Sequence, residues 1–355
     1  MKFHSLNKSK NMRVFSIVLF ALVLVSCAPS NKRIDLKELG ELKELKVTDS
    51  LSLFLGLPTT IKLFDNKLFI VDLFDEKESV KIYDLGKNRM LFSFAKKGEG
   101  PYEYLHVSDV DVYKDLKGRT KINIYDPVSS KLGIYDYDSL MVMNSNYIPM
   151  IISSLNKDVR FHEMFKINDG YLATGLTIEG KYTLLSDSLK IVGHFGRYRP
   201  KPMEGIPDMS HLIANYGKSV LSDNRETLIE IIYNASVLSC YDIKHKEITQ
   251  RWESVIHELD YRMDGEMIIN NAVIGYLSAC ICNNKIYALY SGEPDNLNAV
   301  ATYGKEIHVY DYEGHIINRY SISRPSFALC GDEKMKKIYV LSHIPEPNII
   351  IYDIS

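Results

Sequence analysis

The sequence predicts an all-β protein, a six-bladed β-propeller whose last blade is closed by an N-terminal strand. An apolar strand that ends in Tyr-Asp or a near relative recurs six times, and the steps between successive Asp residues are 52, 51, 55, 69 and 42 residues. A period of about 40–50 residues is typical of a four-stranded propeller blade. The copies are Val80-Lys-Ile-Tyr-Asp84, Leu132-Gly-Ile-Tyr-Asp136, Thr183-Leu-Leu-Ser-Asp187, Leu238-Ser-Cys-Tyr-Asp242, Ile307-His-Val-Tyr-Asp311 and Ile349-Ile-Ile-Tyr-Asp353.

The N-terminal strand is expected because the sixth copy is short. The chain stops two residues after Asp353, where the other copies continue into another strand. An open ring would leave an unpaired strand edge. Two strand-like pieces, Glu44–Thr48 and Leu51–Leu55, lie upstream of the first blade. We expect one of them to complete the last blade.

The repeated Tyr and Asp are predicted to be structural, since every blade carries them. The Asp side chain is expected to accept hydrogen bonds from the turn that follows, and the Tyr is expected to pack within the sheet. The segments 208–216 and 255–261 are each expected either to form a short helix or to remain a loop. No low-complexity linker divides the chain, so residues 42–355 are predicted to form one propeller domain.

Residues 1–26 are predicted to be a lipoprotein signal peptide. A basic start precedes the 12-residue apolar run from Val14 to Val25, which is shorter than the about 20 residues that span a bilayer. Leu24-Val25-Ser26-Cys27 resembles a lipobox, so Cys27 is the predicted lipidation site and residues 27–41 the lipidated Cys and its tether. The alternative is ordinary secretion with an unmodified Cys27.

Composition narrows the class of partner and cofactor. Without the four basic residues of the signal peptide, 39 basic residues face 45 acidic ones, which argues against nucleic acid. Four further cysteines remain: Cys240, Cys280, Cys282 and Cys330. We interpret them as buried free thiols, because Cys280 and Cys282 would point to one face of a strand and are poorly aimed for a disulfide. No metal or cofactor is predicted.

The candidate ligand-binding residues come from loops that meet at one mouth of the channel. These loops join each outer strand to the next inner strand, and each second strand to the third. Arginines there would suit an anionic ligand or the carboxylates of a partner. The alternative is that each arginine pairs with a nearby acid. The candidates are Tyr102, Glu103, His106, Arg160, His162, Arg197, Tyr198, Arg199 and Arg324.

The lipobox, the Gly98-Glu-Gly-Pro101 crossover and the Tyr-Asp repeat together resemble TolB-like six-bladed propeller lipoproteins of the Bacteroidota type. The resemblance implies the architecture and carries over no catalytic residue. Because residues 28–33 lack acidic side chains, an outer-membrane lipoprotein facing the periplasm is expected, with the cell surface as the alternative. Three Asp-Ser-Leu triplets, at Asp49, Asp138 and Asp187, resemble O-glycan acceptors, although two also suit hairpin turns.

Two functions remain open at this point. The first is an envelope-anchored, non-enzymatic binding or scaffold module for a protein, peptide or glycan at the propeller mouth. The second is a propeller lyase or hydrolase that acts on a glycan or lactone. This second function would need a cluster such as His106, His162 and Glu163 with a metal ion.

Overall fold

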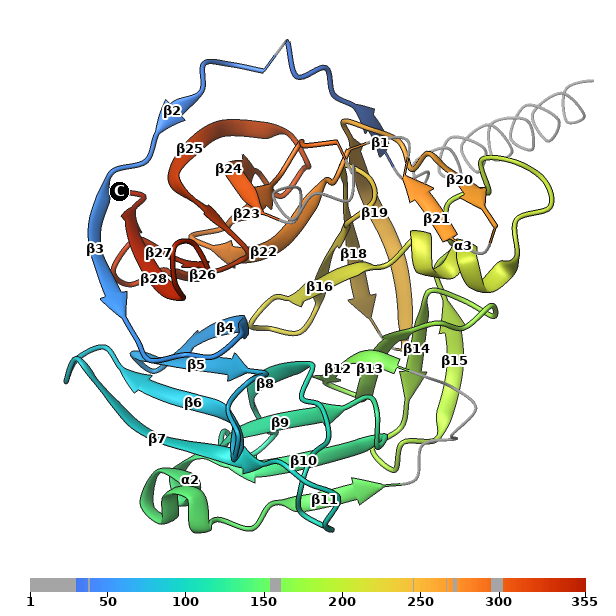
Figure 1. The fold of residues 1–355 in the computed structure, drawn as a ribbon. Helices are drawn as coiled ribbons and strands as arrows, with labels where there is room; N and C mark the ends of the chain where they lie inside the picture. Colours follow the sequence, from blue (N-terminus) through green and yellow to red (C-terminus); the bar gives the residue numbers. More distant parts are fainter. Residues whose placement is uncertain are drawn as a thin grey trace, which may run out of the picture.

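The computed structural model is a ring of six β-sheets whose inner strands surround a common axis (Figure 1), and we call the region along this axis the channel. It describes residues 30–37, 39–153, 161–244, 246–265, 267–270, 273–294 and 303–355. The six-bladed propeller expected from the sequence is therefore confirmed. Among the described residues, none of the helices combines the length and the apolar character that crossing a membrane requires.

Each blade runs from an inner strand at the channel to an outer strand at the rim. Blade 1 consists of β4 (Pro58–Phe64), β5 (Lys67–Asp72), β6 (Glu78–Asp84) and β7 (Arg89–Lys96). Blade 2 consists of β8 (Asp109–Lys114), β9 (Thr120–Asp126), β10 (Lys131–Asp136) and β11 (Met150–Ser153). Blade 3 consists of β12 (Phe161–Ile167), β13 (Gly170–Gly175), β14 (Tyr182–Leu185) and β15 (Ile191–Phe195).

Blades 4 to 6 follow the same plan. Blade 4 consists of β16 (Gly217–Leu221), β17 (Thr227–Ile232), β18 (Val237–Lys244) and β19 (Glu247–Val255). Blade 5 consists of β22 (Tyr276–Cys282), β23 (Lys285–Tyr290), β24 (Gly304–Tyr310) and β25 (Ile316–Ser326). Blade 6 takes β26 (Ala328–Asp332), β27 (Lys337–Ser342) and β28 (Asn348–Asp353) from the C-terminal end of the chain. A separate hairpin of β20 (Tyr261–Asp264) and β21 (Met267–Asn270) follows blade 4 in the chain and lies beside the segment 208–214, where Tyr261 contacts His211 at 2.7 Å.

The last blade is closed by β3 (Val47–Ser52), which pairs antiparallel with β28. This confirms the predicted closure by an N-terminal strand. The observed strand joins the end of one predicted piece to the start of the other. Leu51 supplies the buried side chain of β3 and packs in the apolar cluster between blades 6 and 1.

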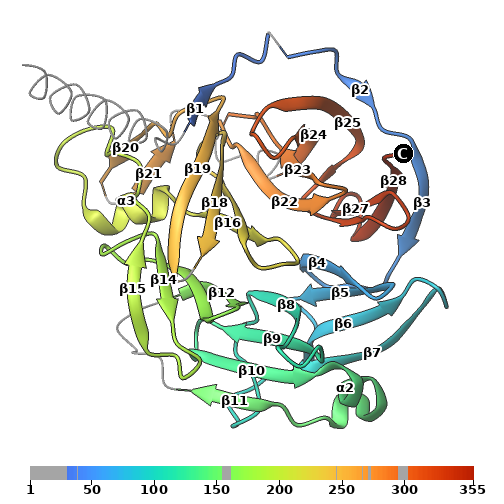
Figure 2. The same cartoon turned by 180° about the vertical axis from the view of Figure 1, so that it is seen from behind.

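The segment before β3 is more ordered than the expected tether over residues 27–41. β1 (Ser30–Arg33) pairs in parallel with β19, and β2 (Lys43–Glu44) pairs in parallel with β25. Figures 1 and 2 show this segment following the outside of blades 4, 5 and 6. We call residues 30–37 and 39–52 the N-terminal strap. The difference has a physical reason, because the outer edges of blades 4 and 5 offer unpaired backbone groups that an added strand satisfies.

The repeated Asp residues hold the turns after the third strands, as predicted. The Asp84 carboxylate accepts the amide hydrogen of Lys87 at 2.9 Å, and Asp311 accepts those of Glu313 at 3.0 Å and His315 at 2.8 Å. In the degenerate third copy the Ser186 hydroxyl takes this role, accepting from the amide of Lys190 at 3.1 Å. The repeat is therefore a device for turns and strand packing.

One local expectation needs correction. Asp138 and Ser139 do not form a hairpin turn; Asp136 instead accepts the Ser139 amide hydrogen at 3.0 Å and caps helix α2 (Tyr137–Met143). Residues 256–260 remain a loop, which is one of the two expected forms; the Ile256 amide donates to the carbonyl of Ser236, and the Ser236 amide donates to the carbonyl of His257. The expected helix over 208–216 is present as α3 (Asp208–Ala214).

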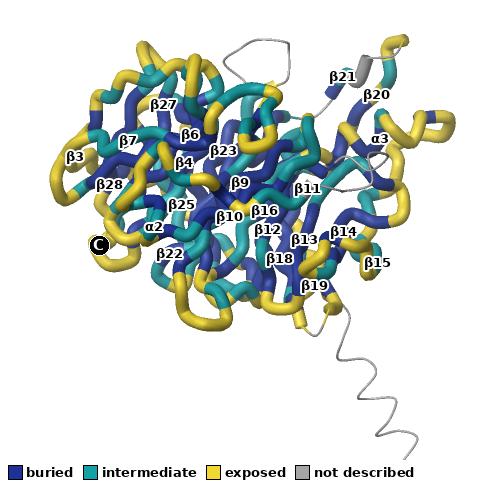
Figure 3. Tube along the Cα trace, turned by 90° about the horizontal axis from the view of Figure 1, so that it is seen from below, coloured by how far each residue is buried: buried dark blue, intermediate teal, exposed yellow. Residues whose placement is uncertain are grey.

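The core consists of apolar layers between neighbouring blades rather than one central mass. Buried residues follow the strands, and exposed residues gather on the loops at both ends of the channel (Figure 3). Cys240, Cys280, Cys282 and Cys330 are all buried and free, as predicted. Because each layer joins two blades, the ring depends on every pair of neighbours, including the pair that β3 completes.

The closing strand gives the first prediction. We expect Leu51→Ala to lower the free energy of unfolding by about 2–4 kcal/mol, because it removes buried methyl groups at the seam of the ring. The matched control is Val47→Ala on the same strand, where the side chain is largely exposed and the expected loss is about 0.5 kcal/mol. Urea unfolding measures both. Equal losses in the two variants would show that β3 does not stabilise the ring.

Candidate functional site

One end of the channel carries the connections that join outer strands to inner strands and second strands to third strands. We call this end the loop-rich face. Asp72, at the end of β5, is fully buried and holds two of its loops together. Its carboxylate accepts the amide hydrogens of Gly56 at 2.9 Å, Leu57 at 2.8 Å and Phe74 at 3.3 Å, and it pairs with Lys81 at 3.1 Å. Burial raises the pKa of Asp72, but these donors outweigh burial and lower it overall.

Asp126 has the same role in blade 2. Its carboxylate accepts the amide hydrogens of Leu105 at 2.7 Å and Val128 at 2.8 Å, and so joins the β7–β8 crossover to the β9–β10 loop. Asp126 is also fully buried. Two buried carboxylates thus fix neighbouring loops of the loop-rich face before any ligand binds.

The fixed loops present apolar side chains to solvent. The Phe54 side chain in the β3–β4 connection is 99% exposed, so it makes almost no packing contact within the protein. Large exposed side chains gather on protein interaction surfaces. On the loop-rich face they include Phe54, Phe74, Tyr102, Leu105, Val128, Ile178 and Ile344. We call these seven residues the apolar set.

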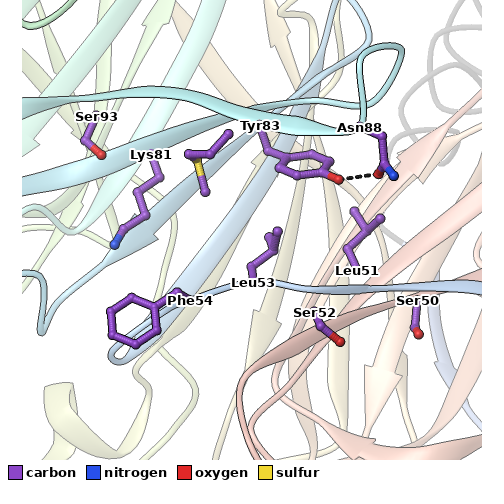
Figure 4. A pocket seen from close by; sticks show the side chains of 10 residues that line it. Ser50, Leu51, Ser52, Leu53, Phe54, Lys81, Tyr83, Asn88 and Ser93 are labelled. Atoms are coloured by element: carbon purple, nitrogen blue, oxygen red, sulfur yellow. Dashed lines mark hydrogen bonds between the residues drawn. The ribbon is translucent and has the colours of Figure 1, made fainter.

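A groove of about 520 Å³ opens beside Phe54, between β3 and the outer half of blade 1. Figure 4 shows Leu53 and Phe54 on one side and Lys81 and Tyr83 on the other. Lys81 is neutralised there by Asp72 and by Asp75 at 2.7 Å. The groove therefore offers apolar surface and hydroxyl groups without an unpaired charge.

The four candidate arginines differ in their surroundings. Arg199 forms ion pairs with Glu253 at 3.1 Å and Glu258 at 2.8 Å, and its side chain is largely buried. Glu253 belongs to outer strand β19, so Arg199 points to the rim. Arg197 and Arg324 are exposed, and Arg160 lies outside the described residues. The local pairing weighed in the sequence analysis accounts for Arg199, while Arg197 and Arg324 remain available to a partner.

Tyr198 and His162 meet at a small cavity of about 30 Å³ between blades 3 and 4. The Tyr198 hydroxyl donates to the carbonyl of Gly175 at 3.0 Å. The His162 ring packs edge-on against Tyr216, and its Nε2 is buried without a partner among the described residues. Burial lowers the pKa of His162. A cavity of this volume can hold one or two water molecules and is too small for an organic ligand.

Tyr102, Glu103 and His106 lie on the β7–β8 crossover, in three different settings. Tyr102 is exposed, and His106 is partly buried. Glu103 accepts the amide hydrogen of Gly100 at 2.9 Å, and its carboxylate occupies the space that a Cβ at Gly98 would need. Gly98 also has a φ of +147°, which favours glycine. Glu103 and the two glycines therefore shape the crossover.

Charged side chains gather inside the channel near the loop-rich face. Asp109 is the first residue of β8, Glu163 the third of β12 and Lys218 the second of β16. Lys62 of β4 reaches Asp109 at 3.8 Å. We call Lys62, Asp109, Glu163 and Lys218 the channel cluster. Burial, together with the nearby Asp109 charge, raises the pKa of Glu163 to about 7.

The sequence reasoning singled out Glu163 but missed the two lysines. Lys62 and Lys218 lie in ordinary strand segments, and only the ring topology brings their long side chains into the channel. The only feature of the sequence that could have indicated these lysines is their position, as the fifth residue of inner strand β4 and the second residue of inner strand β16. Among the described residues, no three His, Cys, Asp or Glu side chains are arranged to hold a metal ion, and His106, His162 and Glu163 do not form such a group.

The raised pKa of Glu163 gives a prediction about stability. The folded protein binds this proton more tightly than the unfolded chain does, so the contribution is complete below about pH 4.5 and is lost as pH rises towards 7. A glutamine at this position cannot ionise, so the variant does not lose this stability as the pH rises. Relative to the wild type, we expect the variant to gain about 2–3 kcal/mol in free energy of unfolding between pH 5 and pH 8.

Urea unfolding at several pH values measures this difference. The matched control is Glu76→Gln, because Glu76 is exposed in the β5–β6 loop of blade 1 and is not part of the channel cluster. Parallel curves for wild type and Glu163→Gln across this range would contradict the assignment of a buried, protonated Glu163.

Comparisons with known proteins agree with this architecture. No curated protein is similar to the chain in sequence. Among solved structures, a Bacteroides fragilis protein described as exported has a TM-score of 0.53 at 9% identity, covering 92% of this chain and 99% of its own. The calcium-binding protein regucalcin from Agrobacterium tumefaciens has a TM-score of 0.52 at 10% identity, covering 89% and 96%. At such identities these likenesses show the fold alone.

The family model described as "TolB-like 6-blade propeller-like" matches residues 38–334. This range includes all six inner strands and most of the loop-rich face. The chain therefore belongs to the TolB-like six-bladed propeller family.

Proposed function

We propose that this protein is an envelope-anchored, non-enzymatic binding module whose loop-rich face binds a protein partner. The observation that carries the proposal is the apolar set, seven exposed side chains on six different loops of one face. Aromatic and apolar anchors of this kind supply most of the binding energy in protein interfaces. The exposed Arg197 and Arg324 on the same face add the residue type that interfaces favour among the charged ones.

The rigidity of the loops supports the same function. Asp72 and Asp126 hold the loops of five members of the apolar set through buried hydrogen bonds. A fixed surface loses little conformational entropy on binding, which favours affinity. The groove beside Phe54 extends this surface towards blade 6, where a side chain of the partner would fit. A peptide or a glycan remains the alternative ligand for this face.

Loss of partner capture tests the role of the loop-rich face. We expect Phe54→Ser with Phe74→Ser to reduce capture in an in-cell crosslinking experiment roughly tenfold or more, because removing interface anchors costs about 2 kcal/mol or more. The matched control is Leu116→Ser with Val142→Ser, since these side chains are 95% and 81% exposed on the opposite face. Mass spectrometry quantifies each captured protein. A partner that is lost equally in both double variants would contradict binding through the loop-rich face.

Anchoring and location form the second part of the proposal. Cys27 lies outside the described residues, and the lipobox motif supports its lipidation. Multiple acyl chains on one cysteine would hold the protein firmly, at about 0.8 kcal/mol for each buried methylene group. The proposed location is the outer membrane, with the propeller facing the periplasm. Ser30 is already paired with blade 4, so the anchor would hold the rim of that blade close to the bilayer.

Fractionation tests the anchor. We expect Cys27→Ser to move the protein from the membrane fraction to the soluble periplasmic fraction, while palmitate labelling is lost. Protease treatment of intact cells distinguishes the two faces of the membrane, because a periplasmic propeller is protected. Membrane association that persists in Cys27→Ser would refute lipidation at this residue, and digestion in intact cells would place the propeller at the surface.

A further inference from the structure

Two lysine side chains of the channel cluster lie near the loop-rich face. The Lys218 ammonium lies 5.6 Å from the centre of the Phe327 ring, which belongs to the connection between blades 5 and 6. The Lys62 ammonium lies 5.9 Å from the centre of the Phe165 ring in blade 3. Lysines from blades 4 and 1 thus meet aromatic rings of other blades, which places both cations within the channel.

The charges of the channel cluster are not equally matched. Lys62 pairs with Asp109. The Glu163 carboxylate accepts hydrogen bonds from the Ser219 amide at 3.1 Å and the Thr174 hydroxyl at 3.1 Å. Within the described part of the chain, the Lys218 ammonium has no carboxylate within ion-pair distance and no hydrogen-bond acceptor. Asp109 and Glu163 are the acids whose charges act on it, and burial still lowers its pKa.

Lys218 is partly buried and differs in this respect from other partly or fully buried cations of the molecule. Lys181 pairs with Glu230 at 2.6 Å, Arg225 with Asp111 at 2.6 Å and Arg319 with Glu306 at 2.7 Å. Partial burial removes some of the water around a charge, so proteins commonly pair such charges or use them to bind a ligand. Lys218 alone in this comparison has its three donors unused.

We propose that Lys218, supported by Lys62, binds an oxyanion group in the channel: a carboxylate, sulfate or phosphate group. The ammonium supplies donors, and the protonated Glu163 side chain supplies no opposing charge below about pH 7. The neighbouring Phe327 ring leaves one side of the ammonium without a polar competitor. The group belongs either to a free small anion or to an acidic side chain or chain end of the partner.

The anion would enter from the loop-rich face. At the other end of the channel, Arg225 from the β16–β17 loop reaches across to Asp111 of β8 and also donates to the carbonyl of Val112. Its guanidinium lies 5.7 Å from the centre of the Tyr113 ring. These contacts join blade 4 to blade 2 and place a cation that is already paired at that end. Entry from the loop-rich face also makes the site reachable by a bound partner.

Sulfate is the probe for the free anion, because its charge is constant across the pH range of interest. We expect sulfate to raise the melting temperature saturably over chloride at matched ionic strength, and Lys218→Met to weaken the fitted affinity at least tenfold. Lys117→Met is the matched control, because Lys117 is an exposed lysine in a loop at the opposite end of the channel. Without sulfate, Lys218→Met should be no less stable than the wild type, since it removes an unpaired, partly buried charge.

Two further arms complete the test. Wild-type affinity for sulfate should fall several-fold from pH 6 to pH 8 as Glu163 ionises between Lys218, Lys62 and Asp109, and Glu163→Gln should abolish this dependence. Partner capture by Lys218→Met then distinguishes the sources: unchanged capture assigns the site to a free anion, and reduced capture assigns it to the partner. Equal sulfate responses in Lys218→Met, Lys117→Met and the wild type would overturn the proposal, whatever the outcome of the capture experiment on the loop-rich face.

Discussion

The antiparallel pairing of β3 with β28 is the interaction on which the ring depends. Blade 6 takes three strands from the C-terminal end of the chain and the fourth from its N-terminal part, so the first and last blades cannot separate without breaking this pairing. The buried side chain of Leu51 adds apolar contact at the same seam. Because all six inner strands face one channel, the geometry of the channel cluster and of the loop-rich face follows from this closure.

The loop-rich face combines rigid backbone with exposed apolar side chains. Asp72 illustrates how this is possible. Its desolvation is costly, yet three backbone amides and Lys81 stabilise the ionised carboxylate, so the loops on either side are held in place. Phe54 and Phe74 extend from these loops and contribute little to the core. A side chain that folding does not need, on a loop that folding fixes, is best explained by binding.

The sequence was sufficient for the blades because each blade repeats a local rule. At the end of each third strand, the Tyr side chain packs within the sheet and the Asp side chain holds the following turn. Both interactions involve residues close together in the chain, so the blade repeat is visible in the sequence. β1 and β2 could not be predicted, because Ser30–Arg33 has no strand pattern and pairs only where β19 offers a free edge. The same holds for Arg199, whose acids Glu253 and Glu258 lie more than fifty residues away. Long-range pairing of this kind depends on topology.

The two lysines of the channel cluster show how a long-range arrangement produces chemistry that no motif encodes. Lys62 and Lys218 are separated by three blades in the chain, and the ring places both near Asp109. A structural role would predict two ion pairs, as at Lys181 and Arg319, but one acid serves Lys62 and the other is held by Ser219 and Thr174. With a pKa of about 7, Glu163 is moreover only about half ionised at neutral pH and cannot neutralise Lys218 fully. The channel therefore retains net positive charge beneath an apolar face, an arrangement that favours a ligand with both apolar surface and an acidic group.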